Sequence, residues 1–141
     1  MTVIDIPAGF EPHFRKSPVT EPWEPLYSRF TDKSVQMGLR LAKAHTNSRG
    51  MIHGGLIAAL SDNAMGYSVA QTMGWDQSKS LLTISLALDF IGSARIGQWL
   101  SIEPEVIRTG STISFAQSLI KADDVVIARA NATFRVLPKR D

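Results

Sequence analysis

The sequence predicts an α+β fold in which an antiparallel sheet packs around one long helix. Residues 53–73 are the only long helix candidate, and segments with alternating apolar and polar side chains lie on both sides of it. Short links such as Thr109-Gly110-Ser111 and Asp123-Asp124 require antiparallel neighbours, because parallel strands need long crossovers. One helix and a meandering sheet together form an α+β layer architecture.

The composition is typical of one ordered domain. The chain has 141 residues, of which 44% are hydrophobic and 20% are charged. This balance excludes disorder for most of the chain, and the length leaves no room for a second independent core. The 15 basic and 13 acidic residues are spread along the sequence, so we expect no nucleic-acid partner.

The amino-acid types and segment types that the sequence lacks exclude several kinds of functional site. With no cysteine and three scattered histidines, the chain has no disulfide or thiolate zinc site, and we expect neither a metal nor a cofactor. No segment is apolar over the length of a bilayer, and the N-terminus lacks the pattern of a signal peptide. We therefore expect a cytoplasmic protein with no membrane partner.

Proline divides the chain. An N-terminal arm, residues 1–25, contains five of the seven prolines, and each of them disfavours helix at its predecessor. We expect this arm to be extended and irregular, and residues 26–141 to form the folded domain. The predicted strands are 26–30 and 35–44, joined as a hairpin through Thr31-Asp32-Lys33, and then 82–91, 99–108, 112–121 and 125–136.

Asp62 is the one charged side chain of the predicted helix. Apolar or small residues cover nearly the whole circumference of that helix, which indicates that protein surrounds it. Burying an ionised carboxylate without partners costs several kcal/mol, so Asp62 needs either satisfied hydrogen bonds or a functional reason. A partly exposed acid at an interface, or one paired to an arginine of the sheet, are the structural alternatives.

His53-Gly54-Gly55 begins the same helix, where backbone N–H groups lack intrahelical partners. Because positions 54 and 55 carry no side chains, a substrate carbonyl can approach these donors, as an oxyanion hole requires. Gly54 and Gly55 are thus candidates for substrate contacts. A tight entry into the helix is the structural alternative.

The spacing Asn47-x5-His53-Gly54-Gly55-x6-Asp62 resembles the PaaI-like subgroup of hotdog-fold acyl-CoA thioesterases. The resemblance extends over residues 26–136 and implies a sheet wrapped around the helix, with subunits that join their sheets edge to edge. It also implies that Asp62 is the general base or nucleophile and that the Gly54 N–H polarises the thioester carbonyl. His53 and Asn47 would orient the carbonyl or the thioester sulfur.

Thr83 lies where related enzymes often use a serine or threonine to hold water. Strand alternation predicts that it shares a face with Ser85, Ala87 and Asp89. The sequence leaves open which face of this strand points toward the helix.

Helix geometry predicts a shared site. Eight residues at ~1.5 Å each separate Gly54 from Asp62 by about 12 Å, whereas reacting groups must lie about 3 Å apart. Two antiparallel helices related by a two-fold axis would place Gly54 of one subunit beside Asp62 of the other. We therefore expect a homodimer, and the resemblance implies that dimers pair into a tetramer.

The implied substrate is an acyl-CoA, whose phosphates need positive charge or free backbone donors. The turn Arg108-Thr109-Gly110-Ser111 is the favoured contact, because it joins a cation to a glycine that permits close approach. Each cation taken singly can also be a solvated surface charge. The remaining cationic candidates are Arg95, Arg129, Arg135, Lys139 and Arg140.

Two other functions fit this fold class. One is a hotdog hydratase or dehydratase, although such enzymes place the acid and histidine differently; the other is a non-catalytic acyl-CoA sensor. The acyl group is not determined by the sequence. Candidates to line its pocket are Met65, Tyr67, Met73 and Phe90.

Overall fold

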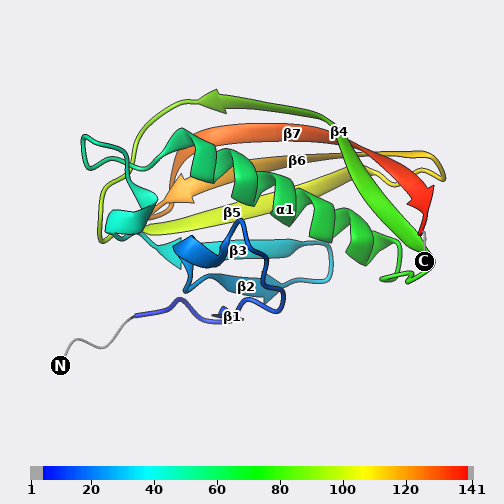
Figure 1. Ribbon diagram of the computed structural model, residues 1–141, viewed down its shortest axis with the longest axis horizontal. Helices are drawn as coiled ribbons and strands as arrows, with labels where there is room; N and C mark the ends of the chain where they lie inside the picture. Colours follow the sequence, from blue (N-terminus) through cyan, green and yellow to red (C-terminus); the bar gives the residue numbers. More distant parts are fainter. Residues whose placement is uncertain (1–4, 140–141) are drawn as a thin grey trace.

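A seven-stranded antiparallel sheet curves around one 19-residue helix in the computed structural model, which describes residues 5–139 (Figure 1). The strand order is β1-β2-β3-β5-β6-β7-β4, so β1 and β4 form opposite edges. The predicted α+β architecture is confirmed. The elements are β1 (Glu11–Pro12), η1 (Glu21–Trp23), β2 (Tyr27–Phe30), β3 (Val35–Arg40), η2 (Lys43–His45), α1 (Gly54–Thr72), β4 (Lys79–Phe90), β5 (Trp99–Arg108), β6 (Ile113–Ala122) and β7 (Val125–Pro138).

The predicted elements differ from the observed ones mainly at their ends. The helix and β5 agree within one residue, and the β2–β3 hairpin is confirmed by antiparallel pairing. The prediction that β3 continues to Ala44 is wrong, since it ends at Arg40. Beyond it, His45 Nδ1 accepts the Ala42 N–H at 2.9 Å and closes the 3-10 turn η2.

The N-terminal arm lies against the sheet. Its short strand β1 pairs with β2, and the His13 N–H donates to the Leu26 carbonyl at 2.9 Å. Phe10 of the arm packs edge-on against Trp99 of β5, with ring centroids 5.2 Å apart. The division of the chain into an arm and a domain at residue 25 stays a prediction. Residues 1–4 of the predicted arm and residues 140–141 of the predicted domain lie outside the described residues.

The helix α1 buries one face in the sheet. Leu56, Leu60, Ala64 and Met65 are almost completely inaccessible, and they recur at the three- to four-residue spacing of one helix face. The opposite face, which carries Asp62, is only half-buried. Within a single chain the expectation of an enclosed helix is therefore met on one face only.

A β-bulge changes the face of β4 on which each side chain lies. Thr83 pairs with Phe134 and Leu86 pairs with Ala132, both partners being buried, while the register shifts between Thr83 and Ser85. The extra residue places Thr83 on the same face of the sheet as Leu86. The predicted row of Thr83 with Ser85, Ala87 and Asp89 is thus wrong, because a bulge inverts the alternation after it.

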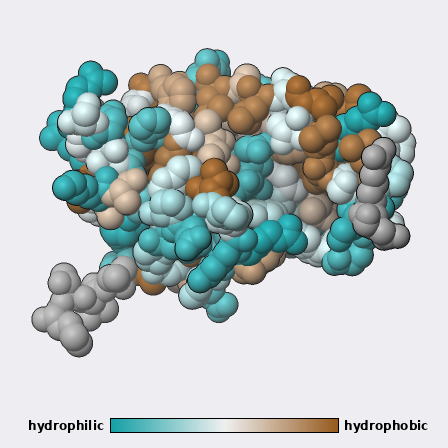
Figure 2. All heavy atoms as spheres, in the orientation of Figure 1, coloured by the Kyte–Doolittle hydropathy of each residue, from teal (hydrophilic) through white to brown (hydrophobic). Residues whose placement is uncertain are grey.

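The edge strand β4 exposes apolar side chains. Leu82 is 54% accessible and Ile84 is 52% accessible, and Leu86, Phe90 and Ile91 are also exposed. Figure 2 shows hydrophobic side chains gathered along the side of the molecule where β4 lies. An edge strand of twelve residues with such a surface is a template for pairing with another strand.

Candidate active site

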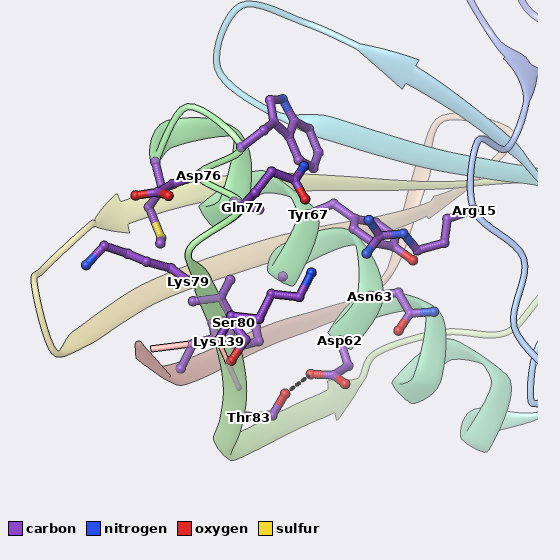
Figure 3. A pocket seen from close by; sticks show the side chains of 16 residues that line it. Arg15, Asp62, Asn63, Tyr67, Asp76, Gln77, Lys79, Ser80, Thr83 and Lys139 are labelled. Carbon is purple, nitrogen blue, oxygen red and sulfur yellow. Dashed lines mark hydrogen bonds between the residues drawn. The ribbon is translucent and has the colours of Figure 1, made fainter. Parts of the chain in front are cut away.

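Asp62 and Thr83 form the centre of the candidate site. Thr83 Oγ1 donates a hydrogen bond to Asp62 Oδ1 at 2.7 Å, and both side chains are half-buried (Figure 3). Neither of the two ion pairs found within residues 5–139 includes Asp62, so pairing with a sheet arginine does not explain this acid. The second carboxylate oxygen, Oδ2, remains available to a water molecule or a substrate.

His53 caps the N-terminus of α1. Its Nδ1 accepts the Gly55 N–H at 2.8 Å, so the neutral ring carries its proton on Nε2 and can act there only as a donor. The Gly55 N–H is therefore used within the chain. The Gly54 N–H occupies the first helical position, where no intrahelical acceptor exists.

Asn47 is oriented by the backbone of its own loop. Its Oδ1 accepts the Arg49 N–H at 2.9 Å and the Met51 N–H at 3.2 Å. Because the oxygen is occupied by these two donors, the side-chain NH₂ is the free end of the amide. Asn47, His53 and Gly54 thus leave three N–H donors in one segment of eight residues, a set suited to a carbonyl oxygen that becomes negative.

The structure forms two groups rather than one complete site. Asp62 lies with Thr83, while Asn47 and His53 lie with Gly54 at the start of the helix. Because α1 is continuous from Gly54 through Asp62, about 12 Å of helix separates the two groups. The unbroken helix on which the shared-site prediction depends is therefore confirmed, and one chain does not bring the acid and the donors together.

A pocket of ≈ 420 Å³ opens beside Asp62 and Thr83. Tyr67 and Met73 line it as the sequence predicts, whereas Met65 is buried in the core and the Phe90 ring lies beside Gly54. Burial raises the pKa of the Tyr67 phenol, and nearby Arg15 partly opposes this shift. The further lining residues are Arg15, Asn63, Gly66, Ala70, Trp75, Asp76, Gln77, Lys79, Ser80, Leu81, Phe134 and Lys139.

Most of these lining residues were missed by sequence reasoning, and Arg15 is the clearest case. It belongs to the arm and reaches the pocket only because Phe14 packs against Tyr67, with ring centroids 5.0 Å apart. An aromatic residue next to a cation inside a proline-rich segment is the only local signal. It does not say which part of the domain the pair contacts.

No residue of the turn predicted to bind phosphate lines this pocket, although Thr109 Oγ1 of the turn lies 2.6 Å from Thr72 Oγ1 at the end of α1. Its Gly110 N–H donates to Ser114 Oγ at 3.2 Å, and a side chain at Gly110 would collide with the Ile113 carbonyl oxygen. Arg108 and Ser111 are exposed, and neither lines the pocket. The internal packing of the turn therefore accounts for its glycine, and phosphate binding there stays a prediction.

The other predicted phosphate contacts are also dispersed. Arg129 Nε donates to Asp89 Oδ2 at 2.8 Å on an exposed part of the sheet. Lys139 lines the pocket, and Arg140 lies outside the described residues.

Comparison with known proteins decides the family. The thioesterase superfamily model matches residues 49–128, a range that contains His53, Gly54, Asp62 and Thr83. The chain belongs to the thioesterase superfamily. This thioesterase is an enzyme that hydrolyses thioesters, and the resemblance that its His-Gly-Gly motif carries is confirmed.

Relatives and solved structures agree with this membership. The chain is 31% identical over 135 residues to the Pseudomonas aeruginosa protein named "Putative esterase PA0474", covering 95% of this chain and 99% of that one. It is 26% identical to human acyl-coenzyme A thioesterase 13 over 97 residues, or 67% of each chain.

Two solved structures share the fold. Zebra fish thioesterase superfamily member 2 superposes with a TM-score of 0.76 at 20% identity, over 84% of this chain and 87% of that one. A Streptococcus pneumoniae thioesterase solved with coenzyme A gives 0.72 at 19% identity, over 84% and 90%. The hotdog fold of this thioesterase is thereby confirmed. In the part of the chain that the structure describes, no helix has the length and apolar character needed to cross a membrane.

Proposed function

We propose that this thioesterase is a homodimer that hydrolyses small-to-medium or aromatic acyl-CoA to the free acid and CoA. The observation that carries the proposal is the Asp62–Thr83 hydrogen bond in the wall of a pocket large enough for an acyl group. Two relatives support the CoA part, since one is named an acyl-coenzyme A thioesterase and the other was solved with coenzyme A.

In the proposed reaction, Asp62 Oδ2 accepts a proton from water, and the water oxygen attacks the thioester carbonyl carbon. The carbon–sulfur bond then breaks, and the CoA sulfur leaves as a thiolate that takes up a proton. In the covalent alternative, Asp62 attacks the carbonyl itself, CoA leaves, and water resolves the mixed anhydride. In both cases the negative carbonyl oxygen accepts hydrogen bonds from the Gly54 N–H, the His53 Nε2–H and the Asn47 amide.

A dimer completes this arrangement. The exposed apolar side chains and unpaired backbone groups of β4 favour antiparallel pairing with β4 of a second copy about a two-fold axis. Each active site would then combine Asn47, His53 and Gly54 of one subunit with Asp62 and Thr83 of the other. Pairing of two dimers into a tetramer stays a prediction.

The first test is release of free thiol from a panel of acyl-CoAs. Turnover supports hydrolysis, a change at C2–C3 without thiol release supports a hydratase or dehydratase, and binding without reaction supports a sensor. The last two outcomes contradict the proposal.

Subunit mixing tests the shared site. An Asp62→Asn chain and an Asn47→Ala chain, each nearly inactive alone, should regain activity together, because one of the two sites in a mixed dimer is intact. Since about half of the dimers are mixed, recovery should reach roughly a quarter of wild-type activity. No recovery after verified exchange would show that the groups act within one chain.

A further inference from the structure

A cation from the N-terminal arm, Arg15, lines the pocket beside Asp62. On α1 the pocket wall includes Gly66, Tyr67 and Ala70. The Arg15 side chain lies next to Tyr67 (Figure 3). The centre of the Arg15 guanidinium is 5.6 Å from the centroid of the Tyr67 ring, within the range of a cation–π contact. The proposed hydrolysis gives Arg15 no role.

Packing of the arm determines the position of Arg15. The preceding Phe14 contacts three rings of the domain, with centroids 5.0 Å from Tyr67, 5.2 Å from Phe30 and 6.0 Å from Trp75. His13 is buried beside Tyr67, and its backbone N–H donates to Leu26. These contacts of His13 and Phe14 hold this part of the arm on the domain and place the adjacent Arg15, whose side chain is exposed, in the lining of the pocket.

The charge of Arg15 is not neutralised by a carboxylate within residues 5–139. Neither ion pair found there includes Arg15, and its guanidinium donates none of the hydrogen bonds found there. The pocket also contains Lys79 and Lys139, while its two acids have other partners. Asp62 accepts from Thr83, and Asp76 accepts from the hydroxyl and the N–H of Ser78.

The pocket that contains both the cation and Asp62 also has apolar lining. Ala70, Met73, Leu81 and Phe134 belong to this lining. Tyr67 follows Asp62 by five residues, which places it about 7–8 Å farther along the helix axis. A short acyl chain with its thioester at Asp62 can therefore extend along the helix toward Tyr67, and the Arg15 guanidinium lies over the ring of that tyrosine.

We propose that Arg15 binds a carboxylate at the far end of the acyl chain, so that the preferred substrates are thioesters of short dicarboxylic acids. The inference rests on the proposed hydrolysis of acyl thioesters at Asp62. A guanidinium suits this ligand because its planar N–H groups match the two oxygens of a carboxylate. The phosphates of CoA present similar chemistry, and the experiment separates the two sources.

The experiment compares two acyl groups of equal length, adipoyl and hexanoyl, which differ in the terminal carboxylate. Each is supplied as the CoA thioester and as the N-acetylcysteamine thioester, which lacks phosphate. In the wild-type enzyme, kcat/KM should be higher for adipoyl than for hexanoyl in both forms. Arg15→Gln should lower kcat/KM for adipoyl by roughly 10- to 100-fold, as for loss of a hydrogen bond between charged groups, and leave hexanoyl unchanged.

Two further variants serve as controls. Lys16→Gln removes the same charge from the adjacent residue, which does not line the pocket. It should change kcat/KM for neither substrate. Arg15→Lys keeps the charge and loses the two-pronged geometry, so it should retain part of the adipoyl preference. Circular dichroism and an unfolding midpoint close to wild type show that each variant is folded.

The remaining outcomes overturn the inference in distinguishable ways. If Arg15→Gln lowered kcat/KM equally for both CoA thioesters and for neither N-acetylcysteamine thioester, Arg15 would be assigned to the CoA phosphates. Wild-type kinetics of Arg15→Gln on every substrate would show that Arg15 contacts no ligand. Absence of thiol release from all four thioesters and from the whole acyl-CoA panel in the wild-type enzyme would instead contradict the proposed function itself.

Discussion

The donor segment and the acid pocket of this thioesterase are built in opposite ways. In the donor segment, residues 47–54, the contacts that orient the side chains join residues two to four positions apart. Asn47 binds the N–H groups of Arg49 and Met51, and His53 binds that of Gly55. The acid pocket instead takes its lining from the arm, from α1, from β4 and from the end of the chain around β7.

This difference separates two aspects of the chemistry. A locally determined set of donors is suited to the carbonyl group, which is common to every thioester. A pocket assembled from distant segments is suited to the acyl group, which varies among substrates. Substitutions in the donor segment should therefore affect all substrates alike, and those in the pocket wall should affect some substrates more than others.

Asp62→Asn is expected to have the largest effect. The amide is nearly isosteric and still accepts the Thr83 hydrogen bond, but it cannot act as a base or a nucleophile. Activity should fall by at least the ~10²- to 10⁴-fold that a positioned base contributes, for every acyl-CoA tested. Steady-state thiol release measures it, and Asp32→Asn, which removes an exposed carboxylate outside the pocket, is the control.

Near-wild-type kcat in folded Asp62→Asn would remove the catalytic role. Loss of stability with activity retained would identify Asp62 as a structural residue.

In the donor segment, Asn47→Ala and His53→Ala should lower kcat by ~10²- to 10³-fold, the usual cost of losing one oxyanion donor. Because these donors contact the carbonyl, the loss should be similar for all acyl groups, and binding of acyl-CoA should persist. Stopped-flow binding and steady-state kinetics separate the two quantities. Ser48→Ala, an exposed change in the same loop, is the matched control.

Unchanged kinetics in both variants would leave the Gly54 N–H as the only supported donor. A loss confined to one class of acyl group would erase the contrast between the two regions.

Thr83→Val is expected to have a smaller effect. It keeps the volume of the side chain and removes the 2.7 Å hydrogen bond to Asp62. Loss of a hydrogen bond to a carboxylate corresponds to roughly 10- to 100-fold in kcat/KM. Thr83→Ser restores the hydroxyl and should recover most of the activity, whereas equal losses in the two variants would indicate a packing role.

The smallest effect concerns the arm and the pH dependence of stability. Burial lowers the pKa of His13 below its ordinary value, nearby Glu24 opposes this shift, and Arg15 adds to it. Below about pH 6.5 the unfolded chain therefore binds more protons at this residue than the folded one. The free energy of unfolding should decrease as the pH falls from that value through the lower pKa of the folded state.

Urea unfolding at several pH values between about 7.5 and 5 measures this dependence. The free energy of unfolding should change less steeply with pH in His13→Gln, since the variant lacks the titrating ring. An identical pH dependence in both proteins would show that His13 does not couple the arm to stability.

Much of the fold follows from short-range patterns. The two-residue period and the short turns predict β5, β6 and β7 within two residues at each end, and the small apolar residues predict α1. The bulge in β4 was not predictable, because a strand with one extra residue has no mark in its local sequence. That single residue decides that Thr83 lies on the same face as Leu86 and Phe90.

The sequence by itself determined the family of this protein, its helix, and the donor motif that begins that helix. These features depend on spacings of a few residues, and backbone geometry turns such spacings into structure directly. Only the tertiary structure decided that Thr83 binds Asp62 and that Arg15 lines the same pocket. Those contacts join residues 21 or more positions apart. They depend on strand register and on the packing of the arm, and local sequence patterns determine neither of these.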